Sequence, residues 1–133
     1  MRILYLLIFF IVSFGCIKEK KAENLVVQAM VNGQWKVTNF NKGGSDMTPD
    51  FASYQFQFKT NFTVDAINNG SVEKTGSWNA DASAQSITSN FQNAVNPVAL
   101  LNGAWIITNN SWTWVEAKQT VNGELMSLRL DKL

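Results

Sequence analysis

Hydrophobic and polar residues alternate along most of the chain after Gly33, and this period of two predicts β-strands. The clearest example is residues 54–59, Tyr-Gln-Phe-Gln-Phe-Lys, which place three aromatic rings on one face and three polar side chains on the other. Residues 62–66, Phe-Thr-Val-Asp-Ala, repeat the pattern after a short break. Such segments are typical of strands with one buried and one solvated face.

The breaks in this pattern divide the folded part into eight predicted strands, at about 33–41, 51–59, 62–67, 72–79, 84–91, 104–109, 111–118 and 124–131. Two breaks, Asn69-Gly70 and Asn122-Gly123, are dipeptides that favour the type I′ turn of a hairpin. The short links between strands predict an antiparallel meander. The exception is 96–102, where Pro97 and the following Gly103 predict a short helix.

Eight strands in an open sheet leave two edges with unpaired backbone groups, and closure removes both. We therefore predict an all-β fold, an antiparallel up-and-down barrel of about eight strands forming one domain over 32–133. Burial is worth roughly 1.5 to 3 kcal/mol per large side chain, so this core needs no disulfide. The side chains expected inside are Trp35, Val37, Tyr54, Phe56, Phe58, Phe62, Val64, Trp78, Ile87, Phe91, Trp105, Ile107, Trp112, Trp114, Met126, Leu128 and Leu130.

The strand at 111–118 allows more than one placement of its aromatic side chains. Trp112, Trp114 and Glu116 share one face, and Val115 lies on the other. Tryptophans that point inward form either an inert core or a pocket of indoles with one carboxylate anchor, which is the usual composition of a small-molecule site. Tryptophans that point outward form a surface strip suited to a sugar face or a partner protein. The candidate ligand-binding residues are Trp35, Tyr54, Phe56, Phe58, Trp78, Trp112, Trp114 and Glu116.

One short motif occurs twice, since residues 32–39 and 102–109 share Asn, Gly, Trp, Thr and Asn at the same relative positions. Both segments are interpreted as a strand that enters the sheet after a glycine and lays an indole across the end of the core. Duplication of the segment is the alternative, although a single recurrence does not define a repeat protein.

The composition of the 133-residue chain excludes several classes of function. With 11 Lys+Arg against 10 Asp+Glu, the chain lacks the positive surplus that nucleic-acid binding needs. It contains no His, which removes the commonest general base and zinc ligand and rules out Ser-His and Cys-His nucleophiles. A single Cys forbids an internal disulfide. We expect a monomer without enzymatic activity, cofactor or metal.

The segment before the domain has the layout of a secretory signal peptide over residues 1–15: Arg2, an apolar stretch over 3–12, and small residues at Ser13 and Gly15. A membrane-spanning helix needs about twenty apolar residues, more than this stretch offers. Residues 16–31 are interpreted as a tether, whose charged part cannot fold alone. Its apolar end, 25–31, is either a helical turn or a first strand.

Ser13-Phe14-Gly15-Cys16 resembles the lipobox of bacterial lipoproteins. In that family a diacylglycerol is attached to the cysteine thiol, the signal is cut just before the cysteine, and the new amine receives an acyl chain such as palmitate. The resemblance implies that Cys16 is lipidated and anchors the protein in the cell envelope. Ile17, where Asp would favour the inner membrane, implies the outer membrane and leaves the leaflet open. The alternative is a signal peptide followed by an incidental free thiol.

Gly33-Gln34-Trp35 resembles the Gly-X-Trp opening of lipocalins. Residues 32–133 are similar to the lipocalin-like domains of Gram-negative lipoproteins, in which a segment like Gly76-Ser77-Trp78 lies mid-chain and one like Trp105-Ile106-Ile107 precedes two final strands. Lipocalins often pack an arginine near the carboxyl terminus on the opening tryptophan. Arg129 is out of phase with the two leucines that flank it, so this contact is not expected here.

Two functions follow from these resemblances. The first is a lipid-anchored protein that holds a small apolar or amphipathic molecule inside the barrel. The second is an accessory or adhesion module that binds a glycan or another envelope protein through surface aromatics. An empty interior of several hundred Å³ favours the first, because ligand pockets have that size. A filled core with Trp112 or Trp114 exposed favours the second.

Overall fold

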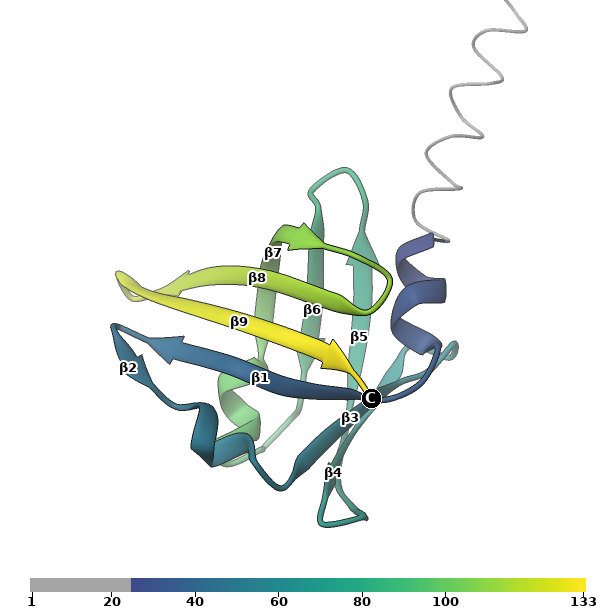
Figure 1. Ribbon diagram of the computed structural model, residues 1–133, viewed down its shortest axis with the longest axis horizontal. Helices are drawn as coiled ribbons and strands as arrows, with labels where there is room; N and C mark the ends of the chain where they lie inside the picture. The colour runs from purple at the N-terminus through teal and green to yellow at the C-terminus, as the bar shows by residue number, and fades with distance from the viewer. Residues whose placement is uncertain (1–24) are drawn as a thin grey trace, which may run out of the picture.

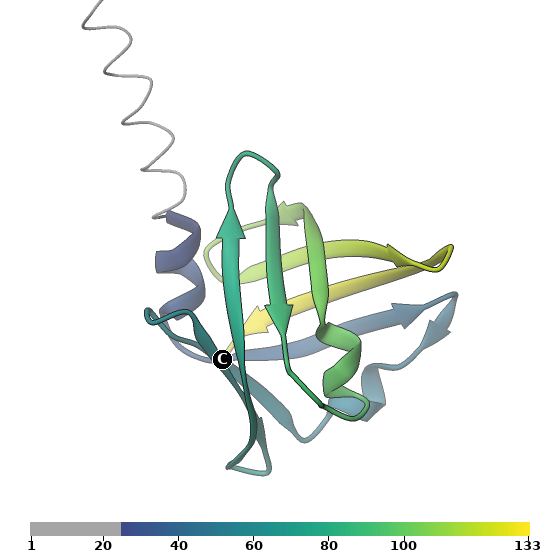
Figure 2. The same cartoon turned by 180° about the vertical axis from the view of Figure 1, so that it is seen from behind.

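A computed structural model describes residues 25–133 of the protein (Figures 1 and 2). Nine strands form one antiparallel sheet, and the pairing of β1 with β9 closes eight of them into a barrel. The ninth, β2, pairs only with the end of β1. The predicted signal peptide, the predicted lipidation at Cys16 and most of the predicted tether lie outside the described residues.

The elements follow one another in the order of an up-and-down barrel. Residues 25–31 form a helix, which settles the alternative left open for this segment (Figure 1). Two short 3-10 helices, η1 (Thr48–Phe51) and η2 (Val98–Leu101), precede β3 and β7. The strands are β1 (Trp35–Lys42), β2 (Ser45–Asp46), β3 (Tyr54–Phe58), β4 (Thr63–Asn68), β5 (Ser71–Asp81), β6 (Ser86–Asn90), β7 (Gly103–Asn110), β8 (Trp114–Val121) and β9 (Glu124–Lys132).

The predicted fold class is confirmed, and each of the eight predicted strands corresponds to a strand of the barrel. Both predicted hairpin turns adopt positive φ at their two central residues, 50° and 82° at Asn69-Gly70 and 52° and 78° at Asn122-Gly123. The short helix predicted at 96–102 is η2. The pattern did not predict β2 or η1.

Because neighbouring strands are antiparallel, their connections alternate between two ends of the barrel. One end, here called the helix end, carries helix 25–31 and the β3–β4, β5–β6 and β7–β8 connections. The other, here called the η2 end, carries η1, η2 and the β4–β5 and β8–β9 turns. Helix 25–31 lies against the outside of the first of these ends, where the chain enters the barrel (Figures 1 and 2). No helix within residues 25–133 has both the length and the apolar character that crossing a membrane requires.

The interior is largely the predicted one. Thirteen of its predicted members are buried, and Ile107 packs against them while partly buried. A register shift in β1 between Val37 and Asn39 adds Phe40, which is fully buried, because a bulge moves the following side chains to the other face. Other buried members come from the segments that close the ends: Met30, Phe51, Val98 and Leu101.

The predicted interior is wrong at three aromatic residues. Phe62 lies in the β3–β4 connection with φ at 63° and is 47% exposed. Trp112 lies in the β7–β8 connection and is 57% exposed. Trp114 begins β8, where the buried side chains are Val115 and Ala117, so its indole points outward. In β8, the side chains of Val115 and Ala117 therefore point inward, and those of Trp114 and Glu116 point outward.

Candidate binding site at the helix end of the barrel

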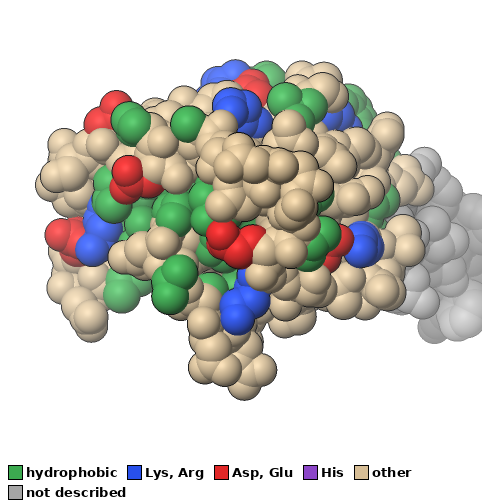
Figure 3. Space-filling model, turned by 90° about the horizontal axis from the view of Figure 1, so that it is seen from below, with side chains coloured by type: hydrophobic (Ala, Val, Ile, Leu, Met, Phe, Trp, Pro, Cys, Tyr) green, Lys and Arg blue, Asp and Glu red, His purple; other side chains and the backbone are tan. Residues whose placement is uncertain are grey.

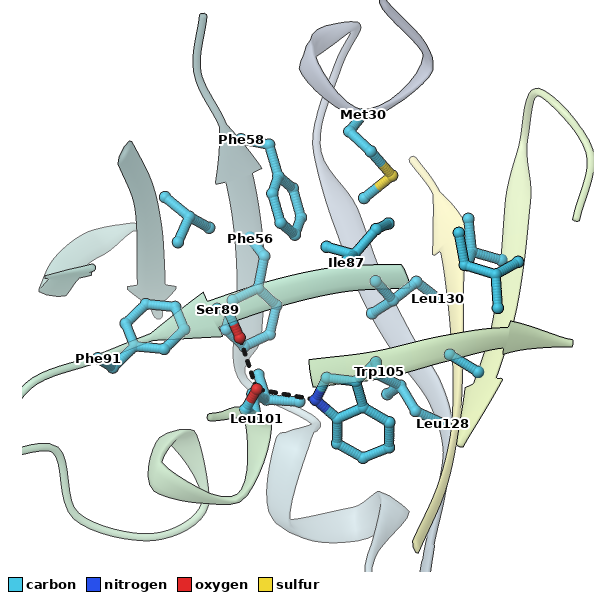
Figure 4. A pocket seen from close by; sticks show the side chains of 14 residues that line it. Met30, Phe56, Phe58, Ile87, Ser89, Phe91, Leu101, Trp105, Leu128 and Leu130 are labelled. Carbon is cyan, nitrogen blue, oxygen red and sulfur yellow. Dashed lines mark hydrogen bonds between the residues drawn. The ribbon is translucent and has the colours of Figure 1, made fainter. Parts of the chain in front are cut away.

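The barrel interior leaves little empty space. Its cavity measures about 40 Å³, whereas small-molecule pockets measure about 300 to 1,000 Å³. The cavity is apolar apart from Ser89, whose Oγ donates a hydrogen bond to the Leu101 carbonyl oxygen at 2.5 Å (Figure 4). Its walls are Met30, Phe56, Phe58, Val64, Ile87, Ser89, Phe91, Leu101, Trp105, Ile107, Val115, Ala117, Leu128 and Leu130. The barrel therefore has a filled core.

Five of the candidate ligand-binding residues belong to this core. Phe56 and Phe58 line the small cavity. Trp35 is fully buried, and its Nε1 donates to the Met30 carbonyl oxygen at 2.8 Å. Trp78 packs edge-on against Phe58, with ring centroids 5.2 Å apart, and its Nε1 donates to the Lys59 carbonyl oxygen at 3.0 Å. These contacts are those of packing residues with satisfied polar atoms.

Tyr54 is the fifth of these residues and is bound at its polar tip. Its hydroxyl lies 2.9 Å and 2.8 Å from the two carboxylate oxygens of Glu73. Burial, followed by the hydrogen bond to Glu73, raises the pKa of the Tyr54 hydroxyl above its ordinary value. The phenol is thus occupied within the protein.

Trp114 and Glu116 lie together on the outer face of the sheet, where Arg129 bridges them. The Arg129 guanidinium carbon lies 4.7 Å from the centroid of the Trp114 ring, and Nη1 lies 3.8 Å from Glu116 Oε1. Arg129 also donates from Nε and Nη2 to Asp131, at 2.9 Å and 3.2 Å, and Thr38 donates to the same carboxylate. These hydrogen bonds, that from Arg129 first, hold the pKa of Asp131 below its ordinary value although burial opposes them. The guanidinium covers one face of the indole, so Trp114 is not an open stacking platform.

Arg129 therefore does not pack on the opening tryptophan, as its phase led us to expect. Lys132 lies there instead, with Nζ 5.1 Å from the centroid of the Trp35 ring. The cation of β9 that covers Trp35 is thus three residues further along the chain.

An open groove of about 340 Å³ lies at the helix end, between helix 25–31 and the β7–β8 connection. Trp112, 57% exposed, and Leu25, 41% exposed, both line it. No lining residue carries an ionisable side chain, and the polar ones are Asn110 and Ser111. The full lining is Leu25, Val26, Ala29, Met30, Ile87, Ile107, Asn110, Ser111, Trp112 and Val115. Trp112 is the one candidate residue from the sequence that the structure places here.

The two walls of the groove are held in place by different contacts. Helix 25–31 packs through Met30, which is 1% exposed, and through partly buried valines. The β7–β8 connection is tied by backbone hydrogen bonds from Ser111 to Trp114 at 2.9 Å and from Lys132 to Thr113 at 2.8 Å. These hydrogen bonds hold the connection that carries Trp112 in place, and the indole remains exposed to solvent.

Side chains of four residues separate the groove from the small interior cavity, since Met30, Ile87, Ile107 and Val115 line both. Met30 comes from the helix and points toward the barrel interior (Figure 4). The groove is thus the outer continuation of the core at the end where the chain enters.

A second open space, of about 500 Å³, lies at the η2 end and differs in chemistry. It is lined by Lys42 and Glu124, which form an ion pair at 3.4 Å, and by no aromatic residue. In the space-filling view from below, acidic and basic side chains lie next to one another at the left edge of the molecule (Figure 3). Of these two spaces, the groove at the helix end is the one suited to an apolar ligand.

Within residues 25–133, no three His, Cys, Asp or Glu side chains come together in a way that could hold a metal ion. The described residues therefore offer no built metal centre.

Comparison with known proteins identifies a related fold. No protein-family model and no curated protein matches the chain. The crystal structure of a DUF4847 family protein from Bacteroides vulgatus ATCC 8482, determined at 1.00 Å resolution, superposes with a TM-score of 0.56 at 14% identity. The match covers 80% of this chain and 96% of that chain. The likeness establishes the fold. At this identity it carries no function across.

The outward phase of Trp114 and Glu116 had a signal in the sequence. A two-residue turn at Asn122-Gly123 determines the register of β8 against β9 and pairs Ala117 with Leu128. Because directly opposite residues share a face, an inward Leu128 requires an inward Ala117 and an outward Glu116. The groove itself had no such signal, since its walls come from segments far apart in the sequence.

Proposed function

We propose that this protein is a lipid-anchored, non-enzymatic binding protein of the bacterial cell envelope, and that it binds a small apolar or amphipathic molecule in the groove at the helix end. The observation that carries the proposal is an uncharged groove of about 340 Å³ with Trp112 57% exposed at its edge. This volume lies in the range of small-molecule sites. The filled core argues against a ligand inside the barrel.

The chemistry of the groove defines the class of ligand. Its aliphatic side chains and the Trp112 ring favour an apolar body, which gains free energy as it leaves water. Asn110 and Ser111 offer hydrogen bonds to a polar group at one edge. Because no lining side chain is ionisable, a ligand with a buried charge would find no counterion there.

The anchor in this proposal is Cys16. Support comes from the lipobox-like Ser13-Phe14-Gly15-Cys16, and Ile17 favours the outer membrane. Each buried methylene of an acyl chain contributes about 0.8 kcal/mol to membrane binding, and a durable anchor needs more than one chain. The lipoprotein pathway supplies several chains at one cysteine, so no transmembrane helix is required.

The test is mass spectrometry on protein purified from its native membrane. Small molecules are extracted from the wild type and from Trp112→Ala, with Trp114→Ala as the matched control, since that indole lies outside the groove. We expect a molecule other than phospholipid, reduced several-fold in Trp112→Ala and retained in Trp114→Ala. Recovery of phospholipid alone from all three would refute the groove ligand. Intact mass separately reports acylation, which Cys16→Ser should abolish.

The filled core and the exposed Trp112 also favour a second candidate, a module that binds an envelope glycan or protein through this indole. Titration with purified envelope polysaccharide, followed by tryptophan fluorescence, tests the glycan form. Saturable quenching that Trp112→Ala removes supports this candidate. An unchanged emission spectrum counts against it.

A further inference from the structure

We infer that the helix end of the barrel faces the bilayer that holds Cys16, with Trp112 in the headgroup region and the groove opening onto the membrane surface. The inference names a lipid surface as the partner of this end. It rests on the lipid anchor of the proposed function and is independent of whether the groove holds a ligand.

The first argument is the length of chain between the anchor and the barrel. Helix 25–31 begins nine residues after Cys16, and an extended residue spans about 3.3 to 3.6 Å, so this link reaches roughly 32 Å at most. A domain of about 100 residues has a radius of gyration of about 13 Å, which corresponds to a sphere roughly 34 Å across. The link is shorter than the domain. An orientation with the η2 end on the bilayer would need the link to stretch almost fully along the domain, which costs conformational entropy, whereas an orientation with the helix end on the bilayer needs no such stretching.

The second argument is the chemistry of the surface that this link holds near the membrane. Trp112 is 57% exposed and Leu25 is 41% exposed, and both line the same groove. Tryptophan favours the membrane interface because its ring is apolar and its N–H can bond to headgroups or water. No groove residue is ionisable, so contact with the interface buries no charge there.

The η2 end lacks these properties. The charged pair of Lys42 and Glu124 would lose water on entering the interface. The exposed large hydrophobic residues near this end are aliphatic: Val72 at 57%, Val95 at 75%, Val121 at 44% and Leu125 at 55%. Of these two surfaces, the one beside helix 25–31 carries the exposed aromatic residue, Trp112, that can anchor at a membrane interface.

Within residues 25–133, two cations near the helix end are engaged within the protein. Lys59 lies 2.7 Å from Asp65, and Lys132 lies over the Trp35 ring. These two cations therefore add little attraction to anionic lipid, and docking of the described surface depends on apolar contact. Its strength should change little between low and high salt, since salt screens charges and leaves apolar burial intact.

The experiment measures tryptophan fluorescence of the full lipidated protein in phosphatidylcholine vesicles. Half of the samples contain phosphatidylcholine brominated near the headgroup end of its acyl chains, because bromine quenches an indole that it contacts. Wild type is compared with Trp112→Phe and with the control Trp114→Phe, whose missing indole lies on the outer wall beneath Arg129. Both substitutions are at surface positions, so the fold is retained.

We expect the brominated lipid to quench the fluorescence of the wild type. Trp112→Phe should lose more than half of this quenching, and Trp114→Phe should retain all of it. Each measurement is made at low and at high salt, and the quenching should be the same at both. Quenching that is absent, or equal in the wild type and Trp112→Phe, overturns the inference. Intact mass is recorded first. A protein without acyl chains on Cys16 refutes the anchor and the inference together, whereas an acylated protein without Trp112 quenching refutes only the inference.

Discussion

The two ends of the barrel are closed by the same local arrangement and are held very differently. Each has a helix, an Asn-Gly pair and a tryptophan whose indole lies over the core, with positive φ of 89° at Gly33 and 108° at Gly103. Trp35 is 0% exposed and Trp105 is 4% exposed. Both copies of the motif therefore adopt the same packing arrangement, a strand that enters the sheet after a glycine and carries a buried tryptophan. Duplication of the segment stays untested.

At the η2 end, side chains bind backbone groups of the last residue of η2 and of the segments before and after it. Trp105 Nε1 donates to the Leu101 carbonyl oxygen at 2.9 Å, and Ser89 donates to the same atom (Figure 4). Asn102 accepts from the Phe91 amide at 2.6 Å and donates to its carbonyl at 3.3 Å. Gln119 donates to the Asn102 carbonyl oxygen at 2.9 Å. This closure is sealed by five hydrogen bonds between uncharged groups.

At the helix end, one hydrogen bond within the described residues joins helix 25–31 to the barrel, from Trp35 to the Met30 carbonyl oxygen. The helix otherwise rests on apolar contacts and leaves the groove beside it. The motif thus buries an indole at either end of the barrel. The surrounding polar side chains decide how many hydrogen bonds hold the covering helix in place. The proposed binding site lies at the less constrained end.

The largest expected change in the free energy of unfolding comes from truncating the side chain that each helix buries in the core. We expect Leu101→Ala to cost about 3 to 4 kcal/mol and Met30→Ala about 2 kcal/mol, within the range for buried large-to-alanine changes. Leu101 is held through its carbonyl oxygen and cannot follow a collapsing cavity, whereas helix 25–31 can shift. Urea unfolding measures both free energies. Equal costs would show that the two closures are equally rigid.

The next effect compares the two glycines of the motif. A Cβ at Gly103 would lie 2.5 Å from Oε1 of Gln119, whereas one at Gly33 would meet only the Lys132 side chain at 3.6 Å. Both positions have positive φ, so alanine is strained at each by about 1 kcal/mol or more. We expect Gly103→Ala to cost about 1 kcal/mol more, because the Gln119 hydrogen bond must also shift. Urea midpoints of the two variants measure the difference, and a costlier Gly33→Ala would contradict it.

The smallest effect concerns pH. At the helix end Asp65, 5% exposed, accepts from Lys59 at 2.7 Å and from Thr75 at 2.7 Å. The Lys59 contact, followed by that of Thr75, holds the pKa of Asp65 below its ordinary value despite burial. Asp65→Asn should therefore cost about 1 kcal/mol at neutral pH, since the pair is partly exposed.

This cost should be complete above about pH 5 and should shrink as the pH falls through the unfolded value near about 3.9 toward the lowered native pKa. Urea unfolding of wild type and Asp65→Asn at neutral pH and near about pH 3 measures the change. Ser89→Ala is the control at the η2 end, because its hydrogen bond is uncharged and its cost should not vary with pH. A pH-independent cost of Asp65→Asn would refute a stabilising carboxylate.

Much of the barrel could be predicted because its information is local. Alternation over 54–59 orients β3, and each Asn-Gly pair sets its own turn, since φ preferences depend on one or two residues. The pattern failed to predict buried residues where their orientation depends on a neighbouring strand. Phe40 points inward because a bulge in β1, where it pairs with β9, changes which face the following side chains occupy. Trp114 turns outward because Ala117 faces Leu128 across the last hairpin.

The sequence by itself determined which segments are strands, where they reverse, and that their alternating side chains suffice for a closed core. Only the tertiary structure decided that this core is filled, that helix 25–31 covers one end, and that Trp112 stands at an open groove beside it. The reason is physical: hydrophobic periodicity reports one buried face within a strand. Cavity volume and exposure depend on how side chains distant in the sequence meet.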